Sequence, residues 1–169
     1  MPLVSISLFL LLIFFSSLTD LKYKKIYNYI TFPFMIGGFI ASFLSYGASG
    51  LLFSLYGALL GVVIYFPLFC FGLLGAGDIK LMTAIGSIIG AKLVFLTGIY
   101  ALASGGIMSI LVLLYHKRLL KTIKQAFWGF FTLIHPKLKF ELPPVSSTLK
   151  TPFAIAIGIG GIIAIYYNF

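Results

Sequence analysis

The chain has 169 residues, of which 61% are hydrophobic and only 9% are charged. The core of a soluble domain of this length cannot bury so much apolar surface, so the composition excludes a soluble class and predicts an integral membrane protein. The net charge is +9. We expect the basic residues to orient the protein in the membrane and to contact anionic lipid rather than to bind nucleic acid.

The apolar runs are continuous, which favours an all-α polytopic helix bundle over a transmembrane β-barrel. We expect a single integral membrane domain over residues 1–169 with about six spans. The single cysteine, Cys70, provides neither a disulfide nor a zinc pair and is expected to be a packing residue. In chain order, the expected spans are Leu3–Leu18, Tyr29–Tyr46, Leu51–Leu74, Ile79–Ile89, Leu93–Tyr115 and Pro152–Tyr167.

The first span is expected to be a retained helix with its N-terminus outside. A signal peptide carries its positive charge before the apolar region, whereas here the lysines Lys22, Lys24 and Lys25 follow it. Asp20 ends this span. Taken alone, it could be an ordinary helix end that balances those lysines.

The motif "GASG" (Gly47–Gly50) follows the second span and matches the GxSG pattern of rhomboid-like serine proteases. A serine nucleophile needs a histidine base within hydrogen-bond reach. The only histidines, His116 and His135, are expected on the opposite side of the membrane from Ser49. We therefore interpret GASG as a tight outer turn.

The run "GLLGAGDIKLMTAIG" begins at Gly72 and places an aspartate, Asp78, in a chain with only 3 acidic residues. Ionisable residues at membrane depth are costly and usually functional. Gly75 and Gly77 lack Cβ atoms, so the backbone beside Asp78 can approach an extended substrate closely. For Gly86, Gly90, Gly105 and Gly106 we favour helix packing.

After the fifth span, residues 116–150 are expected to form a cytoplasmic amphipathic helix and loop. Lys117, Lys121 and Lys124 recur at helical spacing, and Trp128 is a candidate interfacial anchor. If six helices alternate, the loops rich in Lys and Arg all fall on one side, and only Lys92 lies opposite. That side is predicted to be cytoplasmic, and it includes both Asp20 and Asp78.

Two carboxylates at one depth could face each other across the bundle and share one proton. The ionised member could then take a proton from water while the protonated member polarises a peptide carbonyl. Neither a metal nor another cofactor is needed. A divalent cation would want several oxygen ligands, and the third acid, Glu141, lies in a Pro-rich segment.

These segments resemble the type IV prepilin peptidases and the related preflagellin peptidases. The run "GAGDIKLMTAIG" resembles their GxGD signature. "DLKYKKIYNYIT" (Asp20–Thr31) is similar to their first-aspartate segment, and "KTPFAIAIGIG" (Lys150–Gly160) to the start of their last helix. The likeness covers most of the chain in the same order. Tyr27 departs from a usual proline and Ala154 from a frequent glycine.

The resemblance implies an intramembrane aspartic endopeptidase that cuts the leader from pilin-like precursors at the cytoplasmic border of the cell membrane. Asp20 and Asp78 would be its catalytic aspartates. Gly75, Gly77, Lys80 and Asn28 would shape the substrate site. The cytoplasmic domain with two CxxC pairs is missing, as in the short Tad/Cpa-type or archaeal members, so N-methylation is not expected.

Two other classes stay open on the sequence. A small transporter or proton-coupled subunit could use the two aspartates as relay groups, although such groups usually lie near the membrane midplane. An assembly or scaffold subunit would need no chemistry. The implied partners are a precursor-protein substrate and membrane lipid, with no nucleic acid, and the sequence does not specify an oligomeric state.

Overall fold

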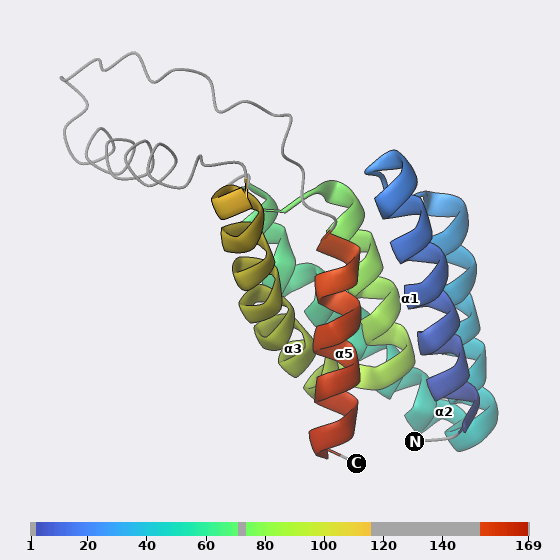
Figure 1. Ribbon diagram of the computed structural model, residues 1–169. Helices are drawn as coiled ribbons and strands as arrows, with labels where there is room; N and C mark the ends of the chain where they lie inside the picture. The colour runs from blue at the N-terminus through green and yellow to red at the C-terminus, as the bar shows by residue number, and fades with distance from the viewer. Residues whose placement is uncertain (1–2, 71–73, 116–152, 169) are drawn as a thin grey trace, which may run out of the picture. The chain divides into compact units, whose positions relative to one another are not determined.

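The computed structural model describes residues 3–70, 74–115 and 153–168, and all the secondary structure in these ranges is helical (Figure 1). The helices are α1 (Leu3–Tyr23), α2 (Asn28–Cys70), α3 (Ala76–Tyr115) and α5 (Phe153–Asn168). By length and apolar composition, α1, α2 and residues Ala76–Val112 of α3 can each cross a membrane. The expected amphipathic helix and loop of residues 116–150 lie outside the described residues.

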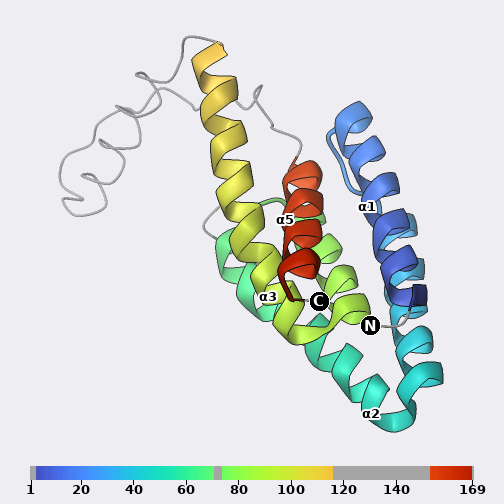
Figure 2. The same ribbon diagram turned by 60° about the horizontal axis from the view of Figure 1, so that its bottom comes forward.

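Two glycines interrupt the long helices α2 and α3. Gly47 has φ 63° and Gly90 has φ 82°, in the left-handed region that glycine enters without steric cost. Each marks a kink that joins two helical arms. In both views the chain folds back on itself at these kinks (Figures 1 and 2). The kinks coincide with the breaks predicted between spans two and three and between spans four and five.

Two of the predicted helix bounds were wrong. Helix α1 continues past Leu18 through Asp20 to Tyr23. It ends there because Lys24 adopts a left-handed conformation (φ 52°) and donates its N–H to the Asp20 carbonyl at 2.8 Å. Helix α3 begins at Ala76 rather than at Ile79. The predicted span began later because it was based on apolar runs, and the first turn of this helix contains Asp78.

The chain divides into two compact units, one of residues 1–105 and 152–169 and the other of residues 106–151. Within the first unit, α1 contacts both α2 and α5. The core centres on the first arm of α3, where Leu81, Met82, Ile85 and Ile88 are at most 1% exposed. This first arm therefore packs inside the unit, and Asp78 lies in its first turn.

Small residues let the second arm of α2 pack closely on the first arm of α3. A Cβ on Gly57 would lie 2.0 Å from the Gly86 carbonyl oxygen, and a Cβ on Gly61 would lie 2.8 Å from the Met82 carbonyl oxygen. Between these backbones, the Ser54 hydroxyl donates to the Ser87 carbonyl. Such small-residue contacts are typical of helix pairs in membranes, where burial of apolar surface drives little association.

We predict that Gly57→Ala destabilises the protein by about 1–3 kcal/mol, because the added methyl group meets backbone that cannot move aside. Thermal unfolding in detergent measures the effect. Gly37→Ala is the matched control in the same helix, since its Cβ would meet only the Leu8 side chain at 3.8 Å. Equal stability of the two variants would contradict the packing argument.

Candidate active site

The Asp20 side chain lies at the end of the buried face of α1. This face consists of Ser5, Phe9, Leu12, Ser16 and Asp20, spaced three or four residues apart. Asp20 is only 8% exposed. A carboxylate buried to this extent requires hydrogen-bond partners to offset its lost hydration.

The partner of Asp20 is the start of helix α5. The Ala154 backbone N–H donates to Oδ2 of Asp20 at 2.9 Å, and Ala154 is the second residue of that helix. The first N–H groups of a helix have no partner within it, and the helix dipole favours negative charge there. The Asp20 carboxylate therefore caps α5 and joins two helices that are far apart in the sequence.

The Asp78 side chain is held in a similar way at the start of its own helix. The Gly75 N–H donates to Oδ2 of Asp78 at 2.9 Å, and the Asp78 N–H donates to the Gly75 carbonyl at 3.0 Å. The first bond is the half of a capping box in which the N3 side chain accepts from the N-cap N–H, with Gly75 as the N-cap; the second is a backbone turn bond. The first bond orients the Asp78 carboxylate.

The two carboxylates lie within electrostatic range of each other. Asp20 lies close enough to Asp78 for their charges to interact, although 57 positions separate them in the sequence. Among the described residues, Oδ1 of each side chain makes no hydrogen bond within the protein. Each carboxylate therefore has one oxygen held by a helix start and one oxygen free for another ligand.

Other predicted site residues lie around this pair. The Lys80 ammonium donates to Oδ1 of Asn28 at 2.8 Å, which ties the first residue of α2 to the first turns of α3. A Cβ on Gly77 would lie 3.1 Å from the Ile26 side chain, so Gly77 allows the α1–α2 turn to approach. Neither Gly75 nor Gly77 has a positive φ; they permit close contact without adopting unusual backbone angles.

Sequence reasoning missed two features of the site. One is the backbone N–H of Ala154, although the "TPFA" start of the last helix had been noted. The other is Ser16, one helical turn before Asp20, whose buried hydroxyl has no hydrogen-bond partner among the described residues. A polar residue four positions from Asp20 was the available signal.

Among the described residues, the site's chemical groups are two carboxylates, an amide, an ammonium and the backbone N–H groups of Gly75 and Ala154. In the described part of the chain, no three His, Cys, Asp or Glu residues group together in a way that could hold a metal ion. Carboxylates with a free oxygen can bind a water molecule and exchange protons with it.

The Ser49 hydroxyl of the GASG motif lies elsewhere. It donates to the Tyr46 carbonyl at 2.7 Å within its own helix, beside the Gly47 kink. Both histidines that could activate it lie outside the described residues.

A comparison with protein families matches residues 6–110 to the type IV leader peptidase family. The matched segment includes Asp20, Asn28 and the whole run from Gly75 to Lys80. Comparisons with curated proteins and with solved structures found no match.

We predict that the Lys80–Asn28 hydrogen bond couples the two residues by about 0.5 kcal/mol in a double-mutant cycle, a small value because both side chains are exposed. Unfolding free energies of Lys80→Met, Asn28→Ala and the double variant measure the coupling. Lys22→Met is the control, because Lys22 lies over the Tyr23 ring. Its effect on the unfolding free energy should add to that of Asn28→Ala without coupling. Coupling that is equally small in both cycles would refute a specific contact.

Proposed function

The chain belongs to the type IV leader peptidase family, and we propose that it is an aspartic endopeptidase that removes the leader of prepilin-like or preflagellin-like precursors. Family membership makes it a peptidase that acts on a precursor protein. Together with the long apolar helices, it also makes the chain a multi-pass membrane protein. The aspartic mechanism, the roles of individual residues and the kind of precursor are our proposal.

One observation supports the mechanism: two acidic side chains lie within electrostatic range of each other, and each has an oxygen without a partner in the described part of the chain. The carboxylates of Asp20 and Asp78 interact electrostatically, and backbone N–H groups bind only Oδ2 of each. A water molecule and the scissile carbonyl can be bound by the two Oδ1 atoms. Like charges at this distance favour a state in which the pair shares one proton.

In the proposed reaction, the ionised aspartate takes a proton from water while the protonated aspartate donates its proton to the scissile carbonyl oxygen. The hydroxide adds to the carbonyl carbon and forms a gem-diol. A proton then moves from the carboxyl that received it to the leaving nitrogen, the C–N bond breaks, and a gem-diol hydroxyl returns its proton to the other carboxylate. The products are a carboxylic acid and an amine, and the pair again shares one proton.

The roles of the neighbouring residues follow from their contacts. Gly75 orients Asp78 through its N–H, and the bare Cα of Gly77 lets the turn at Ile26 approach. We propose that Lys80 and Asn28, joined by their hydrogen bond, hold the start of α2 beside Asp78. Both are exposed and can also contact an extended substrate segment.

For topology we propose six membrane crossings, with each arm of α2 and α3 counted separately at its Gly kink. Helices α1 and α5 supply the other two. This arrangement puts the aspartates and most of the basic residues on the cytoplasmic side and the N-terminus outside. The substrate's apolar helix would then enter from the bilayer while its leader stays in the cytoplasm.

We predict that Asp20→Asn and Asp78→Asn each lower leader removal by at least about 100-fold, the scale of a lost general acid or base. Asparagine still accepts a hydrogen bond from Ala154 or Gly75, so the melting temperature in detergent should change little. Co-expression with a prepilin-like precursor, followed by gel shift, measures cleavage. Glu141→Gln, which neutralises the only other acid, is the control and should cleave normally.

Normal cleavage by either folded Asn variant would disprove the paired-aspartate mechanism. Asp20→Ala and Asp78→Ala add a second test. They also remove the acceptors that cap α5 and α3, and should therefore cost stability as well as activity, by about 1 kcal/mol each.

The proposed topology predicts opposite accessibility for two exposed lysines, Lys24 and Lys92. In a Cys70→Ser background, Lys24→Cys should react with a membrane-impermeant maleimide only in inverted membrane vesicles. Lys92→Cys should react only in right-side-out vesicles or intact cells. Labelling of both positions from the same side would rule out an odd number of crossings between them.

A further inference from the structure

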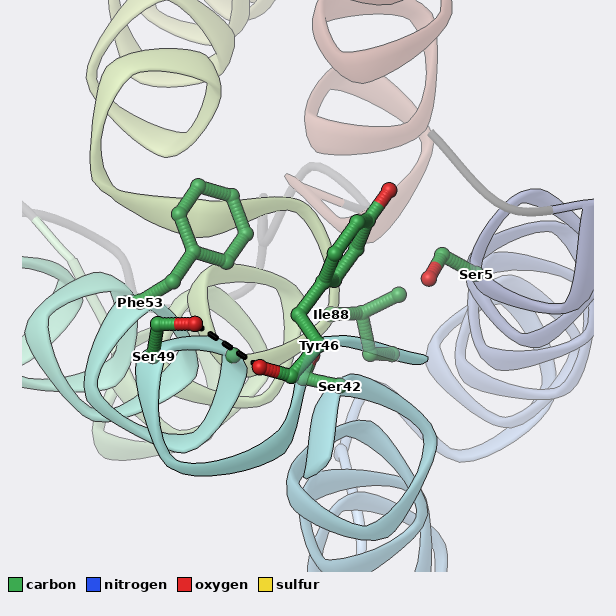
Figure 3. Close-up of a pocket in the computed structure, with 7 residues that line it drawn as sticks. Ser5, Ser42, Tyr46, Ser49, Phe53 and Ile88 are labelled. Carbon is green, nitrogen blue, oxygen red and sulfur yellow. Dashed lines mark hydrogen bonds between the residues drawn. The ribbon is translucent and has the colours of Figure 1, made fainter. Parts of the chain in front are cut away.

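A second candidate site lies beside the Gly47 kink, where α1, α2 and α3 surround a cavity of ≈ 370 Å³ (Figure 3). This volume falls in the range of small-molecule binding sites. The cavity is lined by Ser5, Ser42, Tyr46, Ser49, Gly50, Phe53 and Ile88.

The cavity is separate from the aspartate site. Ser5 lies in the first turn of α1, and Asp20 lies near the other end of the same helix. At 1.5 Å per residue, the two are about 22 Å apart along the helix axis. None of the residues assigned to the peptidase site lines the cavity.

Two serine hydroxyls in the cavity wall have no acceptor. Ser5 is 3% exposed and Ser42 is 4% exposed, and both line the cavity. Neither hydroxyl makes a hydrogen bond to the described part of the chain. By contrast, the Ser7, Ser45 and Ser49 hydroxyls each donate to a carbonyl of their own helix. The Ser5 and Ser42 hydroxyls are therefore available to donate to a ligand in the cavity.

The rest of the lining indicates the chemistry of that ligand. None of the described residues that line the cavity is charged, so they offer no countercharge to an ionic group. Phe53 and Ile88 supply apolar surface. Tyr46 and Phe53 are 60% and 46% exposed, so the cavity borders the outer surface of the helices, which in a membrane protein faces lipid. The ligand is therefore mainly apolar and carries neutral hydrogen-bond acceptors.

The depth of the cavity in the membrane favours a lipid over a partner helix as its ligand. The 21 residues of α1 span about 31 Å, close to the hydrocarbon thickness of about 30 Å. Ser5 therefore lies near a membrane border, the depth at which acyl ester carbonyls occur. The backbone acceptors of a partner helix would already be satisfied internally, whereas an ester carbonyl keeps its lone pairs available for a protein donor.

We propose that this cavity binds a glycerolipid in the leaflet opposite the aspartates. An ester carbonyl accepts hydrogen bonds from the Ser5 and Ser42 hydroxyls, and the acyl chain lies against Phe53 and Ile88. The binding is non-covalent and independent of peptidase chemistry. The lipid fills the space beside the Gly47 kink and so stabilises the folded protein.

The test compares dioleoylphosphatidylcholine with its ether-linked analogue, which has the same headgroup and similar chains but no carbonyl groups. Native mass spectrometry of the full-length protein in detergent measures the binding of each lipid. The wild type should bind the ester form about fivefold or more tightly than the ether form. The double variant Ser5→Ala and Ser42→Ala should bind the ester form as weakly as the ether form.

Ser45→Ala is the matched control, because Ser45 is exposed and bonds to the Ala41 carbonyl; it should keep the ester preference. Ser5→Cys preserves side-chain size but donates weakly, so it should lower the preference even if the double variant folds poorly. Equal binding of the two lipids by the wild type would overturn the proposal. An unchanged ester preference in both Ser5→Cys and the folded double variant would also overturn it. A site that holds only water, or only a co-purified protein, would overturn it as well.

Discussion

The architecture of the site depends on one constraint: a polar group placed in an apolar surrounding must find a partner. Asp20 is buried between helices that are apolar on nearly every face, and the Ala154 N–H supplies its hydrogen bond. The start of a helix is one of the few backbone positions with donors to spare. The requirement of one carboxylate therefore fixes the contact between α1 and α5.

The same constraint links stability to the proposed chemistry. Both aspartates cap helix starts, Asp20 across space and Asp78 within α3, and each uses only Oδ2 to do so. Capping orients the carboxylates and leaves Oδ1 of each free. A catalytic pair needs such rigid orientation, because small displacements of reacting groups are costly. In this protein the orienting groups are backbone N–H groups, which any residue except proline can supply.

Close backbone packing brings the second aspartate into place. Gly57 and Gly86 let the second arm of α2 approach the first arm of α3, and the Ser54 hydroxyl bonds to the Ser87 carbonyl across the contact. On the other side of that arm, the Ser87 hydroxyl donates to the Met35 carbonyl at 3.2 Å. The arm that begins at Asp78 is thus held from two sides by small and hydroxylated residues.

The sequence by itself determined the membrane class, the turn at Gly47 and the identity of the two scarce acids, because composition, glycine and charge are local signals. Gly90 was predicted to be a packing residue, and only the structure assigned it to a kink. Only the tertiary structure decided that Ala154 binds Asp20, that Lys80 reaches Asn28, and that Ser5 and Ser42 share a cavity. Helices that are apolar on all sides have no amphipathic pattern that would indicate which face is buried. The choice of neighbours then depends on where small residues let backbones meet and where buried polar groups find donors, and both conditions exist only in the folded chain.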